Sequence, residues 1–173
     1  MIVSRPTLYR DAALADPSGP SLRKEVSVLV DAGHVVWIRS SSDEGALPPD
    51  VHVIDAGGST IVPGMVDAHS HVTLPGGSYW IDRGADPPEE LLEVAEHNGD
   101  LLGRAGVRWA RDVGSPLAVD PRDGQKRALA LRVRERWRLD PNRPRIRVAG
   151  TWISHSGVIT GGLLIEADDG PPS

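Results

Sequence analysis

The chain has 173 residues, 39% of them hydrophobic and 25% charged, which is the balance of a folded globular protein. It contains no cysteine, so disulfide scaffolds, cysteine-ligated zinc or iron–sulfur centres and cysteine nucleophiles are excluded. No apolar run approaches the roughly 18 residues of a membrane span, and a net charge of −5 argues against a nucleic-acid partner.

The first 62 residues are expected to form a small all-β layer. Residues 26–30 are an apolar run, residues 31–34 have the composition of a tight turn, and residues 35–38 run back. This pattern predicts a β-hairpin. Residues 51–55 are a further candidate strand, which ends at Ala-Gly-Gly.

From residue 63 onward the pattern changes to alternating strands and helices. The expected elements are a strand through 63–71, a helix from about 87 to 105, a strand at 107–113, a helix from about 123 to 137, and a strand at 145–150. Pro87 and Pro88 suit a helix start and Gly106 suits its end. The order β-α-β-α-β is typical of a parallel α/β unit, which places functional groups at the carboxyl ends of its strands.

One short segment carries the strongest chemical pattern. Asp67, His69 and His71 alternate along the chain, so an extended strand would place all three side chains on one face. Two imidazoles about 6 to 7 Å apart along a strand can converge on one divalent ion. A carboxylate on the same face is well placed to orient such a ligand. Taken alone, His-x-His pairs also occur as surface residues, so both interpretations stay open.

In context this segment resembles a known family. The run PGMVDAHSH at residues 63–71 is similar to the P-G-x-x-D-x-H-x-H signature of the metal-dependent amidohydrolase superfamily. Residues 105–114, and residues 149–157 with the following glycines, resemble the imidazolonepropionase and Xaa-Pro dipeptidase-like branch. Residues 35–38 and 53–58 are similar to that family's N-terminal β-sandwich portion. The resemblance covers roughly residues 20 to 162, with the motifs in the family's order.

The resemblance implies an α/β fold: the start of a (β/α)8 TIM barrel, about three βα units in residues 63–173, after a small β-sandwich segment in residues 1–62. It implies hydrolysis of C–N bonds, in a cyclic amide or a dipeptide, by water activated on a divalent metal, for which zinc is the expectation. His69 and His71 match the two metal ligands of the first strand. The small-molecule amide is the expected substrate class.

Among the other candidate residues, Asp112 and His155 each have two interpretations. Asp67 is expected to support the metal ligands, and Asp112 either supports the site or caps the turn after its strand. His155 either contacts substrate or is solvated in its loop. His34, His52 and His97 have no motif around them and are expected at the surface. The five arginines between residues 127 and 138 are expected to face solvent on a helix, not nucleic acid.

The sequence also departs from the family. The remaining family ligands are a carboxylated lysine on strand four, histidines on strands five and six, and an aspartate on strand eight. Here the two lysines, Lys24 and Lys126, both precede His155, and a complete barrel typically needs about 250 residues. Two histidines are half of the ligands of a typical zinc site. The isolated monomer is therefore expected to be inactive.

Three hypotheses follow. The first is the N-terminal portion of an amidohydrolase, from a truncated or split reading frame. The second is a non-catalytic binding or assembly module that keeps the start of the fold and joins a complementary chain or a homo-oligomer through an uncovered strand edge. The third is a remnant without function. The first residues lack an export signal, so a cytoplasmic location is expected, with no membrane and no nucleic-acid partner.

Overall fold

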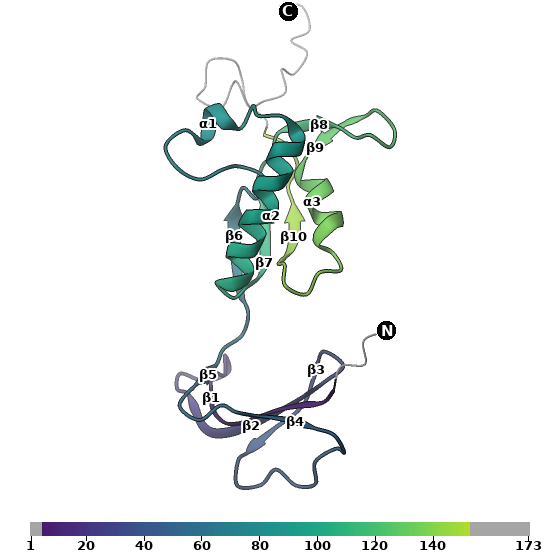
Figure 1. Ribbon diagram of the computed structural model, residues 1–173. Coiled ribbons are helices and arrows are strands. Elements are labelled where there is room, and N and C mark those ends of the chain that lie inside the picture. The colour runs from purple at the N-terminus through teal and green to yellow at the C-terminus, as the bar shows by residue number, and fades with distance from the viewer. Residues whose placement is uncertain (1–4, 153–173) are drawn as a thin grey trace, which may run out of the picture. The chain divides into compact units, whose positions relative to one another are not determined.

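The computed structural model describes residues 5–152 (Figure 1). The chain divides into two compact units, with the boundary between Pro63 and Gly64. Each unit has its own sheet, and they are described separately below. Within the described range, no helix is both long enough and apolar enough to cross a membrane.

The first unit is a five-stranded sheet with the order β3-β2-β1-β4, in which β5 also pairs with β1. Its strands are β1 (Thr7–Leu14), β2 (Arg23–Asp31), β3 (His34–Ser40), β4 (His52–Asp55) and β5 (Thr60–Ile61). The predicted hairpin is confirmed, because β2 and β3 pair antiparallel. Ala32 and Gly33 between them both have positive φ, as a two-residue hairpin turn requires. The strand predicted at residues 51–55 is confirmed as β4.

No local sequence pattern marks β1, the central strand of this sheet. β1 pairs antiparallel with β2 and parallel with β4 and β5. Its register jumps between Tyr9 and Ala12, and Asp11 between them has a φ of 62°. This bulge, together with the charged Arg10 and Asp11, breaks the apolar alternation by which a strand is recognised. Leu8 and Ala12 are nevertheless buried, which fixes β1 as part of the core.

The second unit is a three-stranded parallel sheet with the order β10-β7-β6, and the helices α2 and α3 pack on one of its faces (Figure 1). The predicted β-α-β-α-β order is confirmed. The elements are β6 (Met65–Ser70), α1 (Trp80–Arg83), α2 (Pro88–Arg104), β7 (Val107–Asp112), β8 (Leu117–Val119), β9 (Lys126–Ala128), α3 (Ala130–Trp137) and β10 (Arg145–Val148). The core between helices and sheet is formed by Leu91, Leu92, Ala95, Ala110, Ala130, Val133, Trp137 and Ile146.

Helix α2 follows the sequence signals closely. Pro88 is its first residue, and two glutamates in the first turn complement the positive end of the helix dipole. It ends where Gly106 adopts a φ of 84°, as expected. Gly99 lies against the indole of Trp137, where a Cβ would overlap the ring. Because Gly99 has no side chain, α2 and α3 can pack closely at this point. The indole Nε1 of Trp137 also donates to Glu96 on α2 at 3.3 Å.

The second predicted helix was wrong in its first part. Residues 117–128 form an antiparallel hairpin of β8 and β9, and α3 begins at Ala130 instead of about residue 123. The hairpin loop is held by Asp120, whose carboxylate accepts from Arg122 at 2.6 Å and from Arg127 at 3.0 Å. Gly124 has a φ of 73° in this loop, a conformation that an α-helix does not allow.

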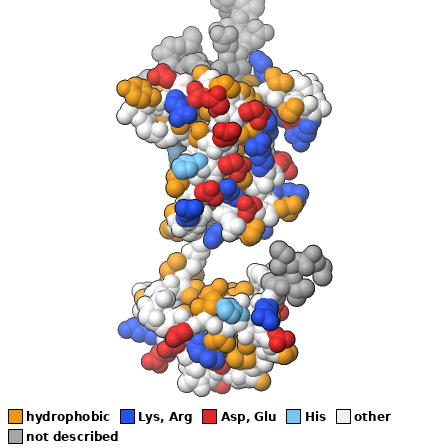
Figure 2. Space-filling view, viewed as in Figure 1, with side chains coloured by type: hydrophobic (Ala, Val, Ile, Leu, Met, Phe, Trp, Pro, Cys, Tyr) orange, Lys and Arg blue, Asp and Glu red, His pale blue; other side chains and the backbone are white. Residues whose placement is uncertain are grey.

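The helices of the second unit carry intermixed acidic and basic side chains (Figure 2). Arg132 on α3 pairs with Glu89 on α2 at 2.8 Å, and Arg143 pairs with Asp100 at 2.6 Å. The Arg132 pair, together with contacts of Arg134 with Glu135 and of Arg136 with Glu89, balances the arginines of α3 with neighbouring carboxylates. The expectation that this helix faces solvent, without forming a basic patch, agrees with this pairing.

Candidate functional site

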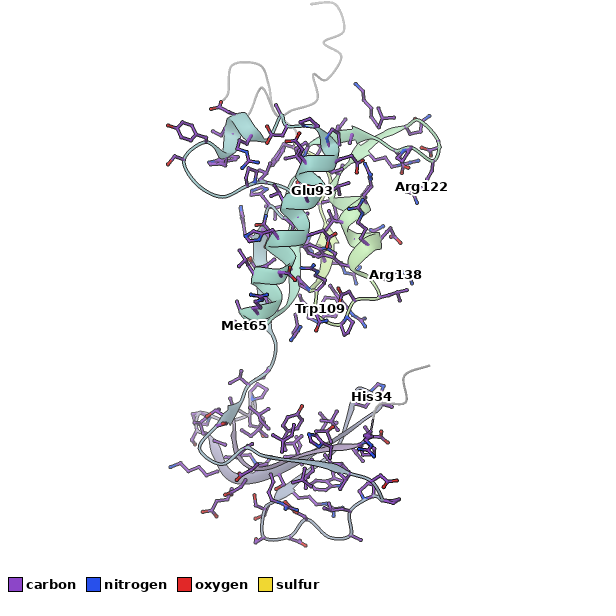
Figure 3. All side chains as sticks on the ribbon, in the orientation of Figure 1. His34, Met65, Glu93, Trp109, Arg122 and Arg138 are labelled. Atoms are coloured by element: carbon purple, nitrogen blue, oxygen red, sulfur yellow. The ribbon has the colours of Figure 1, made fainter. Side chains whose placement is uncertain are left out.

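His69 is the second-last residue of β6 and His71 directly follows the strand, so both lie at its carboxyl end. Met65, labelled in Figure 3, marks the opposite end. Their ring centroids are 5.4 Å apart and the rings meet edge to face at 80°. The His69 side chain is exposed and that of His71 is half-buried. The strand therefore presents two neighbouring imidazoles at the end of a parallel sheet, where α/β proteins place functional groups.

The imidazole of His71 is fixed by a contact to the backbone of a distant segment. Its Nδ1 lies 2.8 Å from the carbonyl oxygen of Gly114. Because a carbonyl oxygen can only accept, Nδ1 carries the proton and Nε2 keeps its lone pair. This is the usual state of a metal-binding histidine, whose second nitrogen donates to a carbonyl or carboxylate. The indole of Trp152 lies on the same imidazole, with centroids 5.4 Å apart.

Asp67, two residues before His69, makes its side-chain hydrogen bonds to its own strand. Its Oδ1 accepts from the backbone N–H of His69 at 3.0 Å, and its Oδ2 accepts from the Ser70 hydroxyl at 2.5 Å. The β6–β7 register shifts between Asp67 and Ser70, which pair with the buried Ala110 and Asp112. Strict alternation, which the sequence analysis assumed, is interrupted by this irregularity. Asp67 therefore braces the backbone of the strand end.

Asp112 is completely buried at the end of β7. Its Oδ2 accepts from the Val72 N–H at 2.9 Å, and its Oδ1 accepts from the Gly114 N–H at 3.3 Å. Burial raises the pKa of this carboxyl to about 7, although the two N–H donors act in the opposite direction. Asp112 therefore caps the turn after β7 and also binds the backbone N–H of the residue that follows His71.

The other histidines that the structure describes lie on other elements. His34 and His52 are exposed in the first unit and His97 is exposed on α2. His155 lies outside the described residues. Among residues 5–152, no group of three or more His, Asp and Glu side chains is arranged to hold a metal ion. The donors that are present fit a divalent metal as one half of a tetrahedral set.

Sequence reasoning assigned no role to two groups at this site, the Gly114 carbonyl and the Trp152 indole. Each lies at least 43 residues from His71 in the chain, and no local pattern links them. Close to the pair, the hydroxyl of Thr73 is buried without a hydrogen-bond partner among the described residues. The amide of Asn98 on α2 donates to the carbonyls of Val72 and Leu74, both at 3.0 Å, and so holds the segment after His71.

Comparison with known proteins gives consistent relatives. No protein-family model matches the chain. It is 34% identical over 77 residues to an N-substituted formamide deformylase of Arthrobacter pascens, a match that covers 42% of this chain and 14% of the relative. It is 35% identical over 120 residues to an imidazolonepropionase of Deinococcus radiodurans, which covers 66% and 27%. The chain thus spans about a quarter or less of the length of these curated relatives.

Solved structures share the fold of this chain. A crystal structure of an amidohydrolase is 26% identical with a TM-score of 0.61, and the match covers 83% of this chain and 31% of that one. A Xaa-Pro dipeptidase with methionine bound in its active site shares the fold with a TM-score of 0.66 at 20% identity, covering 86% and 34%.

Proposed function

The chain belongs to the amidohydrolase superfamily, and its partial coverage of the relatives fits an N-terminal portion; on that premise we propose that it supplies the first metal-binding strand of an enzyme that hydrolyses C–N bonds. The relatives act on small amide-type molecules, an N-substituted formamide in one case and an imidazolone in another. A small cyclic amide or a dipeptide is the proposed substrate class.

The observation that carries this proposal is the pair of imidazoles at the end of β6, with Nε2 of His71 left as a lone-pair donor by the Gly114 contact. We propose His69 and His71 as two ligands of a divalent metal, with zinc as the first candidate because imidazole nitrogen suits it. When bound, such a metal lowers the pKa of a water molecule so that hydroxide forms near neutral pH. The two imidazoles would hold it and Asp67 would brace their strand.

The proposed architecture follows from the strand order. In the three-stranded sheet of the second unit, β6, β7 and β10 lie side by side in chain order and run parallel, with α2 and α3 on one face, as at the start of a (β/α)8 barrel. About three βα units in residues 63–173 are proposed on this basis. The separate five-stranded sheet of the first unit supports the proposal of a β-sandwich portion in residues 1–62. Within residues 5–152 two ligands stand where a zinc site normally has four, so the chain by itself is proposed to be inactive.

Metal binding by the purified chain tests the proposal. Native mass spectrometry and titration calorimetry with Zn²⁺ should show one ion per chain, bound weakly because half of the donors are present. Replacing either histidine, as in His69→Ala or His71→Ala, should abolish this binding, whereas His97→Ala on the exposed face of α2 should leave it unchanged. Zn²⁺ binding that persists in both site variants, or no binding by the parent chain, would contradict the assignment.

A specific feature favours the second candidate function, a non-catalytic assembly module. On β6 and β7, Met65, Val66 and Trp109 are 50%, 69% and 44% exposed, which is unusual for large apolar residues in a parallel sheet. A homo-oligomer or a complementary chain would cover them. Sedimentation of the parent chain and of Trp109→Ser tests this reading: it requires an assembly that Trp109→Ser dissociates, and a monomeric parent chain counts against it.

A further inference from the structure

The acceptor that orients His71 is not part of its own strand. Gly114 is the second residue after β7, and its carbonyl reaches the imidazole only if the turn after β7 is held in place. That turn is anchored on both sides: Val113 donates to the Ser70 carbonyl at 2.9 Å, and Ser115 donates to the Gly150 carbonyl at 3.2 Å. The position of the carbonyl therefore depends on the ends of all three parallel strands.

One buried side chain joins the two segments whose relative position matters. The carboxylate of Asp112 accepts from Val72, the residue after His71, with one oxygen, and from Gly114 with the other. The imidazole and its acceptor are thus tied to the same carboxylate through the backbone on each side. Loss of this carboxylate would release both segments, and a relative displacement of about 1 Å would carry the 2.8 Å contact between Nδ1 and the Gly114 carbonyl beyond hydrogen-bond distance.

The Trp152 indole also packs near the imidazole, with ring centroids 5.4 Å apart and ring planes tilted by 41°. A Cβ on Gly114 would overlap the indole of Trp152, so the indole lies directly on the glycine as well as beside His71. Gly114 is buried, and no side chain fits between its backbone and the ring. His71 therefore contacts both the Gly114 carbonyl and the Trp152 indole, and a glycine at position 114 allows the indole to lie this close.

We propose that Asp112 is a positioning residue for His71, which through the Gly114 carbonyl keeps the imidazole proton on Nδ1 and presents Nε2 as the binding nitrogen. The presentation of Nε2 to a metal rests on the proposed function, but the position of the proton does not. In an imidazole exposed to water neither nitrogen is fixed as the protonated one. A proton held on Nδ1 of His71 is therefore a direct measure of its contact with the Gly114 carbonyl.

NMR of the full chain with ¹⁵N-labelled histidine tests the proposal. The spectra are recorded at about pH 8, above the ordinary histidine pKa of about 6.5, where ¹⁵N shifts distinguish a ring protonated at Nδ1 from one protonated at Nε2. The resonance that disappears in His71→Ala is expected to have its proton on Nδ1 in the parent chain. In Asp112→Asn this proton should move to Nε2 or exchange between both. A folded Asp112→Asn variant that keeps the Nδ1 proton would overturn the proposal, as would an Nε2 proton in the parent chain.

A second variant keeps the test decisive if Asp112→Asn does not fold. Gly114→Ala introduces a methyl group against Trp152 and should displace the carbonyl and release the same proton, and Gly114→Ala combined with Trp152→Ala should restore it. An Nδ1 proton that survives Gly114→Ala would refute the link through this carbonyl. Zn²⁺ affinity is measured in parallel, with a 10- to 100-fold loss expected in Asp112→Asn. Failure of the parent chain to bind Zn²⁺, with the proton on Nδ1, would contradict the proposed function alone.

Discussion

Replacing Asp112 with asparagine should flatten the pH dependence of the folding free energy between about pH 5 and 8. Burial raises the pKa of Asp112 from 3.8 to about 7. The folded protein therefore holds this proton more tightly than the unfolded chain, and stability falls as the pH rises from about 4 to 7. Each pKa unit corresponds to about 1.4 kcal/mol, so a difference of roughly three units amounts to about 4 kcal/mol over the whole range.

Urea unfolding followed by circular dichroism at 222 nm measures this effect, since α2 and α3 both belong to the second unit. The parent chain should lose about 3 kcal/mol between pH 5 and 8 that the Asp112→Asn variant does not lose. Asp120→Asn is the matched control. Arg122 holds the pKa of Asp120 well below its usual range, so this carboxylate is ionised throughout and its loss should lower stability equally at both pH values. Equal pH slopes in the parent chain and Asp112→Asn would refute the reasoning.

Three further predictions concern stability. Leu91→Ala leaves a cavity in the core of the second unit and should cost about 2 to 5 kcal/mol in urea unfolding, whereas Leu101→Ala at an exposed position should cost little. Gly106→Ala should cost about 1 to 2 kcal/mol in thermal unfolding, because its φ of 84° is strained for alanine. Glu44→Gln should lower the urea midpoint of the first unit near neutral pH. Because Arg10 lowers the pKa of Glu44, the stabilisation by this carboxylate is present above its ordinary pKa of 4.5 and fades in acid. A decrease of the midpoint that is as large in acid as at neutral pH would contradict this account.

Several features could be predicted because they depend on neighbouring residues. The hairpin around Gly33 follows from a short Asp-Ala-Gly-His turn segment, in which the glycine accepts positive φ, between two apolar runs. Helix α2 follows from Pro88 and Gly106 at its ends and from apolar spacing between them. The spacing of His69 and His71 already places two imidazoles within reach of one another, and the structure brings their rings to 5.4 Å.

Other features depended on contacts between distant segments. β1 is charged and bulged at Asp11, and its place at the centre of the first sheet comes from pairing with strands 45 to 47 residues away in sequence. The start of α3 was misjudged because the ion pairs of Asp120 with Arg122 and Arg127 stabilise a hairpin where local propensity favoured a helix.

The sequence by itself determined the alternation of strands and helices, the family resemblance and the two histidines, because each is written in the order of nearby residues. The tertiary structure alone decided how those histidines are held. The irregularity in β6 turns Asp67 toward Ser70, the turn after β7 brings the Gly114 carbonyl to His71, and buried Asp112 joins the two strand ends. Parallel strands bring the ends of remote segments together, and hydrogen bonds between such segments leave no periodic trace in the chain.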